Sequence, residues 1–292
     1  TVAGATSVSN AADSGLVTAV FPRTEAEPLT SVSIDGTAEY GQTLTAVVLP
    51  TGATATYQWL IADDVGGTYE IIGGATNSTY DVAAGDVGKY IKVEANGTLE
   101  YTGTVTSDPT GAVAAQTITI TVIPGVTVPV QGATPVTDIT ETAEYTGTVT
   151  WDPDDTEFEY YTVYTATITL TTKEGYTLEG VSEDFFTVAG TDTVANAADS
   201  GLVTAVFPRT EAEPLTSVSI DGTAQYGETL TAIVLPDGAT VNYQWLVSID
   251  DIDYLPISGA TESIFTIPSD YVGKYIKVEA TGTGVYDGKV IS

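Results

Sequence analysis

Residues 10–38 read NAADSGLVTAVFPRTEAEPLTSVSIDGTA, and the same letters return unchanged at residues 196–224. The similarity continues on both sides of this block, where TVAG and YQWL recur at the same spacing of 186 residues. The chain is therefore about one and a half periods of a tandem array. Repetition at a fixed spacing indicates units that contact mainly their neighbours, and such chains provide length or surface more often than one unique pocket.

The chain is 292 residues long and strongly acidic, with 39 Asp and Glu against 8 Lys and Arg and a formal net charge of -31. This charge argues against nucleic acid and anionic lipid as partners, because both are bound through Lys and Arg. Charged residues are only 16% and hydrophobic residues 42%, so the chain can bury a core and is not a disordered acidic tail.

Cys, Met and His are all absent. Disulfides, thiolate metal sites and thiol nucleophiles are thereby excluded, as is the usual acid–base group of neutral pH. No stretch approaches the roughly 20 apolar residues of a membrane span, so we expect no membrane insertion of this segment. The first residue is Thr and no signal-peptide pattern precedes it, which is typical of a segment taken from a longer polypeptide.

Strand patterns dominate the chain. Residues 164–171 read YTATITLT, in which one face carries Tyr164, Ala166, Ile168 and Leu170 and the other face carries only Thr. This alternation predicts a half-buried strand of an antiparallel sheet. No segment has a convincing helical period. The predicted fold class is all-β.

Two kinds of module alternate. Module A occupies residues 28–113 (module A1) and again residues 214–292 (module A2), and module B occupies residues 114–213 between them. Residues 1–27 match only the last part of module B. Each module has the length of a small independent domain.

The junctions between modules differ in composition. FPRTEAEPL, at residues 21–29 and 207–215, has two prolines around polar residues, which predicts a semi-rigid spacer and not a free tether. SDPTGAVAAQ, at residues 107–116, has the composition of a looser connection.

Module A resembles the immunoglobulin-like domains of large bacterial surface proteins. The matching motifs are the YQW strand, the GAT-x-S-x-Y/F segment at residues 74–80 and 259–265, and VGKYIKV at residues 87–93 and 272–278. Module B resembles another repeat of Gram-positive surface and S-layer-associated proteins through GATPVT, YTATITLT, KEGYTL and FFTVAG. The resemblance implies a tandem array of immunoglobulin-like β-sandwich modules located outside the cell.

One departure from antibody-type domains concerns the VGKYIKV strand. The usual alignment would place Lys92 at a buried Cys position, and a buried unpaired Lys is very costly. We therefore expect the opposite parity, with Ile91, Val93 and Ala95 facing the core. Trp59 of the YQW strand and its counterpart Trp245 have the parity of core residues.

Acidic clusters are the candidates for metal binding. The weak candidates are Asp152, Asp154 and Asp155, since loop carboxylates can supply several of the six to eight oxygens that calcium takes. Shorter clusters occur at residues 63–64 and 250–253. None matches an ordered calcium loop, so solvated turn residues are the favoured interpretation, with calcium at a joint or between chains as the alternative and no other cofactor expected.

Trp151 is the candidate for an external contact. It follows TGTVT and directly precedes Asp-Pro-Asp-Asp, a position at the end of a strand. Paired carboxylates can hydrolyse glycosides, but the sequence does not place two of them at a fixed separation. It also lacks a Gly-x-Ser-x-Gly elbow, and we expect no catalytic residues and no enzymatic activity.

Most of the basic residues recur between the copies. Exposed ion pairs contribute little each, and contacts to the carboxylates of a neighbouring module or chain are the alternative. The recurring pairs are Arg23 with Arg209, Lys89 with Lys274, and Lys92 with Lys277.

These patterns predict a structural segment of a bacterial surface protein, such as a stalk, fibre or surface-layer element. Its partners would be neighbouring modules or further copies of the protein, and residues 1–27 could complete a sandwich in an adjacent chain by strand addition. The alternative for these residues is a simple cut from a longer polypeptide. The alternative function is an adhesin whose modules bind glycan, cell-wall or protein ligands.

Overall fold

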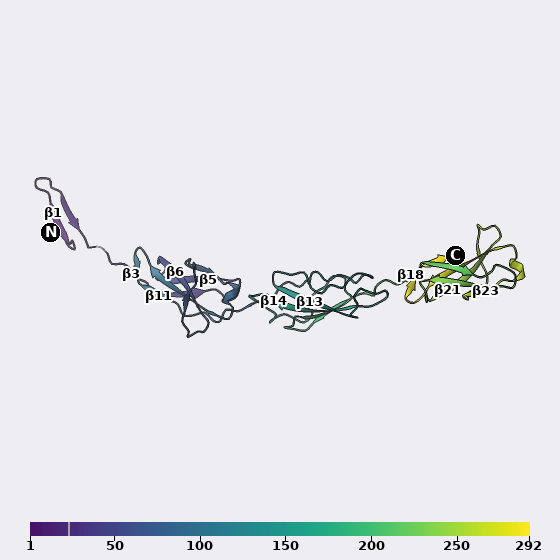
Figure 1. Ribbon diagram of the computed structural model, residues 1–292. Coiled ribbons are helices and arrows are strands. Elements are labelled where there is room, and N and C mark those ends of the chain that lie inside the picture. The colour runs from purple at the N-terminus through teal and green to yellow at the C-terminus, as the bar shows by residue number, and fades with distance from the viewer. Residues whose placement is uncertain (23) are drawn as a thin grey trace. The chain divides into compact units, whose positions relative to one another are not determined.

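The computed structural model describes residues 1–22 and 24–292. The chain forms two compact units: one comprises Thr1–Thr119 with Thr172–Gly180, and the other comprises Ile120–Thr171 with Val181–Ser292. In the described residues the secondary structure is β-strands and two short 3-10 turns, with no α-helix. No helix found among those residues has the length and apolarity that a membrane span needs. The all-β prediction is confirmed (Figure 1).

Module A1 is a sandwich of a three-stranded and a four-stranded sheet with mostly antiparallel pairing. The three-stranded sheet has the order β4 (Ser31–Asp35), β5 (Thr43–Leu49) and β8 (Thr79–Asp81). The four-stranded sheet has the order β11 (Thr104–Thr106), β9 (Tyr90–Gly97), β6 (Ala55–Ala62) and β7 (Glu70–Ile71). Two further elements complete the module: the 3-10 turn η1 (Ala84–Asp86) and a short parallel pair of β3 (Glu27–Pro28) with β10 (Tyr101–Thr102).

Module A2 repeats this plan strand for strand. Its three-stranded sheet has the order β19 (Ser217–Asp221), β20 (Thr229–Leu235) and β23 (Ile264–Thr266). Its four-stranded sheet has the order β22 (Leu255–Pro256), β21 (Val241–Ser248), β24 (Tyr275–Gly282) and β26 (Lys289–Ile291). The 3-10 turn η2 (Ser269–Tyr271) and the parallel pair β18 (Glu213–Pro214) and β25 (Tyr286–Asp287) are also present.

The main sheet of module B has four strands. Its order is β13 (Tyr145–Asp152), β14 (Thr165–Thr172), β17 (Leu202–Val206) and β16 (Thr193–Asn196). Two shorter strands, β12 (Gln116–Thr117) and β15 (Tyr176–Thr177), form a parallel pair within the first compact unit. Near the N-terminus, β1 (Ser7–Asn10) and β2 (Val17–Val20) form a separate antiparallel hairpin.

The predicted strand parities are confirmed. Ile91, Val93 and Ala95 are fully buried in module A1, so the neighbouring lysine faces outward. Trp59 and Trp245 are fully buried at the centre of the two module A cores. In module B, Tyr164 directly before β14 and Ala166, Ile168 and Leu170 within it are all buried.

Candidate functional site

The joint between module B and module A2 lies at residues 210–215. Its first residues, Thr210 and Glu211, are hydrogen-bonded to module B. Thr210 is only 6% exposed, and its hydroxyl donates to the carbonyl of Glu159 at 2.7 Å. The same hydroxyl accepts the amide of Thr162 at 2.9 Å, and the amide of Thr210 donates to the carbonyl of Thr162 at 2.9 Å. Glu211 adds a bond, because its carbonyl accepts the amide of Tyr161 at 2.8 Å. Four hydrogen bonds thus tie three polar groups of the joint region to module B.

Two residues after Glu211, the chain begins to form hydrogen bonds with module A2. The amide of Glu213 donates to the carbonyl of Val285 at 2.9 Å, and the amide of Leu215 donates to the carbonyl of Asp287 at 2.8 Å. Between Glu211 and Glu213 lies one residue, Ala212. Ala212 is therefore the single residue between the two sets of backbone hydrogen bonds, and the semi-rigid spacer predicted from the composition of this segment stays a prediction.

At the joint between module A1 and module B, backbone hydrogen bonds to the two modules are again separated by a single residue. Ala114 donates its amide to the carbonyl of Ala38 at 2.8 Å and accepts the amide of Tyr40 at 2.9 Å. Two residues later, the amide of Gln116 donates to the carbonyl of Gly175 at 2.8 Å. Residues 107–116 have the composition of a looser connection, yet Ala114 and Gln116 within them are both paired through their backbones.

Ring packing closes the same joint within the first compact unit. The rings of Tyr40 and Tyr176 meet edge to face, with centroids 5.2 Å apart. Gly175 has a φ of +90°, and a Cβ there would come within 2.7 Å of Tyr40 and 3.0 Å of the Cβ of Ala84. Glycine is needed at this position both for the backbone conformation and for the close approach.

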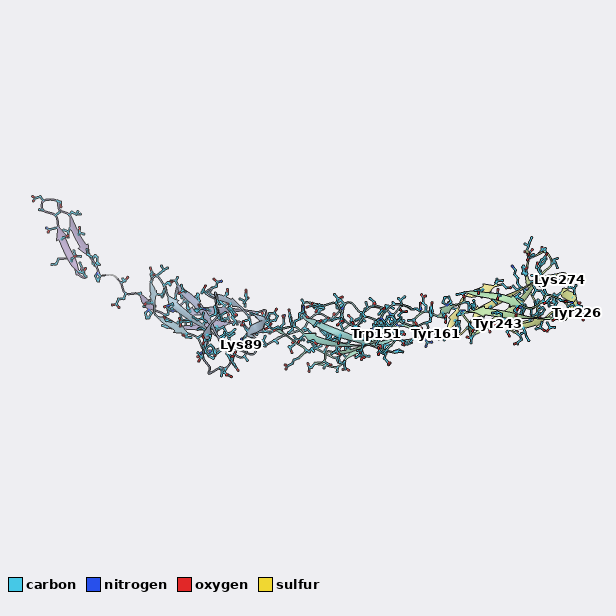
Figure 2. The ribbon with its side chains drawn as sticks, viewed as in Figure 1. Lys89, Trp151, Tyr161, Tyr226, Tyr243 and Lys274 are labelled. Atoms are coloured by element: carbon cyan, nitrogen blue, oxygen red, sulfur yellow. The ribbon has the colours of Figure 1, made fainter. Side chains whose placement is uncertain are left out.

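The expectation that Trp151 offers an external contact is wrong. Its side chain is only 8% exposed, and its ring packs against Phe158 and Phe207 with centroids 5.0 and 5.4 Å away. The indole N–H donates to the carbonyl of Val136 at 2.8 Å. The alternation along β13 turns Trp151 inward, and Figure 2 marks its place in module B.

The acidic candidates do not converge on a metal site. Asp152 and Asp154 are exposed, and the carboxylate of Asp155 accepts the hydroxyl of Tyr164 at 2.5 Å. Among residues 1–22 and 24–292 no group of three or more acidic side chains is placed to hold an ion. Asp155 has a structural partner instead, since it fixes the hydroxyl of a core tyrosine.

The acidic cluster of module A2 organises a turn. The carboxylate of Asp250 accepts the amides of Ile252 and Asp253 at 3.0 and 3.1 Å and the hydroxyl of Ser248 at 2.8 Å. These backbone bonds lower the pKa of Asp250. The neighbouring Asp251 accepts the hydroxyl of Tyr254, and that hydrogen bond raises the pKa of Tyr254 to about 12.

The recurring lysines lie over tyrosine rings. Lys92 Nζ is 4.4 Å from the ring centroid of Tyr69, and Lys277 Nζ is 4.5 Å from that of Tyr254. These pairs lie at equivalent positions of the two copies, so each repeated lysine contacts a tyrosine of its own module.

The other recurring basic residues behave in the same local way. Arg209 lies 4.1 Å from the ring of Tyr161, also within one compact unit. The contact of Lys89 with Asp63 is long, at 4.0 Å, and exposed, so it contributes little. The first member of the arginine pair, Arg23, lies outside the described residues.

The N-terminal hairpin has an uncovered apolar side. Val17 and Phe21 are 56% and 58% exposed, whereas their exact sequence counterparts Val203 and Phe207 are fully buried in module B. The two sequences are identical, so the difference in exposure comes from the residues that pack against these side chains. Residues 1–22 therefore present a face that module B keeps inside.

Sequence reasoning missed a pair of glutamines. The amide group of Gln58 donates to the carbonyls of Trp59 and Ile72, both at 2.9 Å, and ties the central strand to its neighbour. Gln244 does the same in module A2 with Trp245 and Ile257 at 2.8 and 2.9 Å. The recurrence of the Gln in both YQW strands was the available signal.

No protein-family model matches the chain, and no curated protein matches its sequence. Among solved structures, the chain is similar to the crystal structure of the chicken CNTN1 FN1–FN3 domains. The identity is 11%, the match covers 90% of this chain and 96% of that chain, and the TM-score is 0.21.

Proposed function

We propose that this chain is a structural spacer, a repeat segment of a stalk, fibre or surface-layer element on a bacterial surface. The observation that carries the proposal is the double anchoring of its joints. At Ala115 and at Ala212 a single residue separates the hydrogen bonds of one module from those of the next. Such joints restrict bending, and repetition then converts self-contained sandwiches into length.

The modules themselves support a mechanical function. Each copy of module A closes its own apolar core around one tryptophan, so each can bear load without help from its neighbours. The acidic composition suits an exposed extracellular surface, because a large net charge opposes self-association. The extracellular location is proposed from this composition and from the resemblance to surface-protein repeats.

An exchange experiment tests the spacer against the adhesin alternative. Residues 114–213 would be replaced, in the protein on its native surface, by an unrelated sandwich module of similar length. A spacer keeps its function after this exchange, because only the distance matters. Loss of function on exchange, together with saturable binding of the unmodified chain on a glycan array, would establish the adhesin instead.

Strand addition through residues 1–27 is a second candidate, favoured by the exposed face of Val17 and Phe21. Substitution of either residue by Asp should abolish self-association in sedimentation equilibrium experiments. The matched control is Leu16→Asp, since Leu16 and its counterpart Leu202 are both exposed and the change should have no effect. A chain that remains monomeric at every concentration excludes this mode of assembly.

A further inference from the structure

Each module begins with a short parallel strand pair. The entering strand β3 pairs with β10 in module A1, β12 pairs with β15 in module B, and β18 pairs with β25 in module A2. Each pair is only two residues long, and parallel pairing is slightly less stable per residue than antiparallel pairing. Such a pair adds little stability to a module that is not under load, yet both kinds of module have one where the chain enters.

The hydrogen bonds of the three pairs follow one pattern. In module A1 the amide of Glu27 donates to the carbonyl of Glu100 at 2.8 Å. Two residues later, the amide of Leu29 donates to the carbonyl of Thr102 at 2.8 Å. The other two pairs have the same spacing of two donors, which are Glu213 and Leu215 in module A2, at 2.9 and 2.8 Å, and Gln116 and Ile118 in module B, at 2.8 and 3.1 Å.

The second donor of each pair is also a core residue. Leu29 and Leu215 are 6% and 8% exposed, and Ile118 is 2% exposed. In both copies of module A the residue between the two donors is a proline, Pro28 or Pro214. Proline is tolerated there, because only alternate residues of a strand bond to the same neighbour. The entering chain is thus fixed by two hydrogen bonds and one buried side chain.

In module A1 the partner strand β10 is the start of the segment that leaves the module. It leads directly into β11 and then into residues 107–114. This leaving segment is bound along its length. The amide of Ser107 donates to the carbonyl of Val93 at 2.9 Å, and the amide of Val113 donates to the carbonyl of Lys89 at 2.8 Å. Figure 1 shows β3 at one end of module A1. The entering strand is therefore bonded to the chain that carries tension out of the module.

Tension loads this pair in shear. The two strands run in the same direction, so the preceding chain pulls β3 back at its first residue while the following chain pulls β10 forward at its last. Both hydrogen bonds bear the load together and must break at nearly the same time, as Leu29 leaves the core. A pull that separates the two strands from one end would break the same bonds one after the other.

We propose that the β3–β10 pair and the β18–β25 pair are tension clamps, which keep module A folded when the chain is pulled from its ends. In module A2 the partner strand β25 likewise leads directly into the last strand, β26. Strand β15 of module B is followed by further strands of its own module, so the proposal concerns the two copies of module A. The inference goes beyond the spacer function, because a chain can set a distance without resisting tension.

Single-molecule force measurements on the whole chain, pulled in two directions, test the clamp. The chain has no cysteine, so pulling handles attach only where one is introduced. Handles at Ala26→Cys and Ala115→Cys pull module A1 from end to end. Handles at Ala26→Cys and Glu100→Cys, the residues directly before β3 and β10, separate the clamp strands from one end. The end-to-end unfolding force should be about twofold higher, because forced unfolding follows the barrier to breaking the loaded bonds. An end-to-end force that is equal or lower overturns the proposal.

A proline variant tests the donors themselves. Glu27→Pro removes one of the two amides that share the load and leaves the core residues unchanged. The end-to-end unfolding force of module A1 should fall by about half, while its urea midpoint hardly moves. Glu25→Pro is the matched control, because it places a proline two residues before the clamp and should leave the force unchanged. Equal forces in the two variants overturn the proposal. If Glu27→Pro fails to fold, the two pulling directions of the unmodified clamp still decide.

Discussion

Gly175 lies against the ring of Tyr40, so closely that a Cβ at position 175 would come within 2.7 Å of the tyrosine Cδ1. This contact joins a loop of module B to the end of module A1 inside one compact unit. The loop is anchored there by the hydrogen bond between Gln116 and Gly175 as well. The joint thus has both a packed and a hydrogen-bonded component.

The substitution Gly175→Ala should loosen this joint. The positive φ of a non-glycine residue costs about 1–2 kcal/mol, and the clash with Tyr40 adds about 1–3 kcal/mol. The measurement is the urea midpoint together with hydrogen exchange at Gln116 and Ile118, which should accelerate.

The control for this variant is Gly74→Ala. Gly74 has a similar φ of +79°, but a Cβ there meets nothing within 4 Å, so only the conformational cost applies. Equal destabilisation by the two substitutions would show that the contact with Tyr40 is not tight.

Trp59→Ala should unfold module A1 while leaving module A2 intact. Loss of a fully buried Trp costs about 3–5 kcal/mol, and the carbonyl of Asn77 loses its indole donor at 2.9 Å. Calorimetry should lose or shift one transition and keep the one that Trp245 supports. The mirror variant, Trp245→Ala, should affect the other transition. Simultaneous loss of both would contradict self-contained modules.

Module B should lose stability in strong alkali through Tyr145. Burial, with the nearby Glu144 carboxylate, raises the pKa of this residue to about 12. The folded pKa lies above the unfolded value of about 10, so this contribution is complete below pH 10 and is lost as the pH rises towards 12. Chemical unfolding followed from pH 8 to 12 should show the decline, and Tyr145→Phe should show less of it. A stability that is flat across this range in the unmodified chain would contradict the assignment.

Thr210→Val should weaken the hold of module B on its joint. The isosteric change removes the hydroxyl that donates to Glu159 and accepts from Thr162, and the unpaired buried groups cost about 1–3 kcal/mol. Faster hydrogen exchange at Thr162 is the expected observation. Thr24→Val is the matched control, because Thr24 is the exposed counterpart in the first copy and its change should be neutral.

The period-2 patterns predicted most of the strands and cores, because a half-buried strand must alternate. They predicted the inward faces around Trp59 and Ile168 correctly. The same rule would have placed Trp151 inside, since Tyr145, Val149 and Trp151 share one parity along β13. The acidic turn that follows suggested exposure, but the orientation of a side chain is set by its strand.

Identical letters do not always adopt the same structure here. The run EYTGTVT occurs at residues 100–106 and again at residues 144–150. In the first case Gly103 has a φ of +88° and breaks the run into two short strands. In the second, Gly147 lies inside the continuous strand β13, where a Cβ would come within 2.8 Å of the carbonyl of Thr169. Tertiary packing decides between these backbones, and a single sequence does not contain that information locally.

The hydrogen bonds at the joints could also not be predicted from the local sequence. The composition predicted a semi-rigid spacer only for the junction at residues 21–29 and 207–215. The backbones of Ala114 and Gln116 in the other junction are also hydrogen-bonded. Their partners are far away in the sequence, so the local composition does not reveal them. The partners of Thr210 are likewise some fifty positions upstream. Long-range backbone pairing is set by the fold as a whole.

Electron–electron distance measurement across the joint at Ala212 reports whether that joint holds module B and module A2 in one arrangement. The chain has no cysteine, so spin labels at Thr204→Cys in module B and Ser219→Cys in module A2, both exposed positions, report that joint alone. A rigid joint gives a narrow distance distribution, which broadens severalfold when Gly-Ser repeats are inserted after Ala212. A distribution in the unmodified chain as broad as in the inserted variant would contradict it.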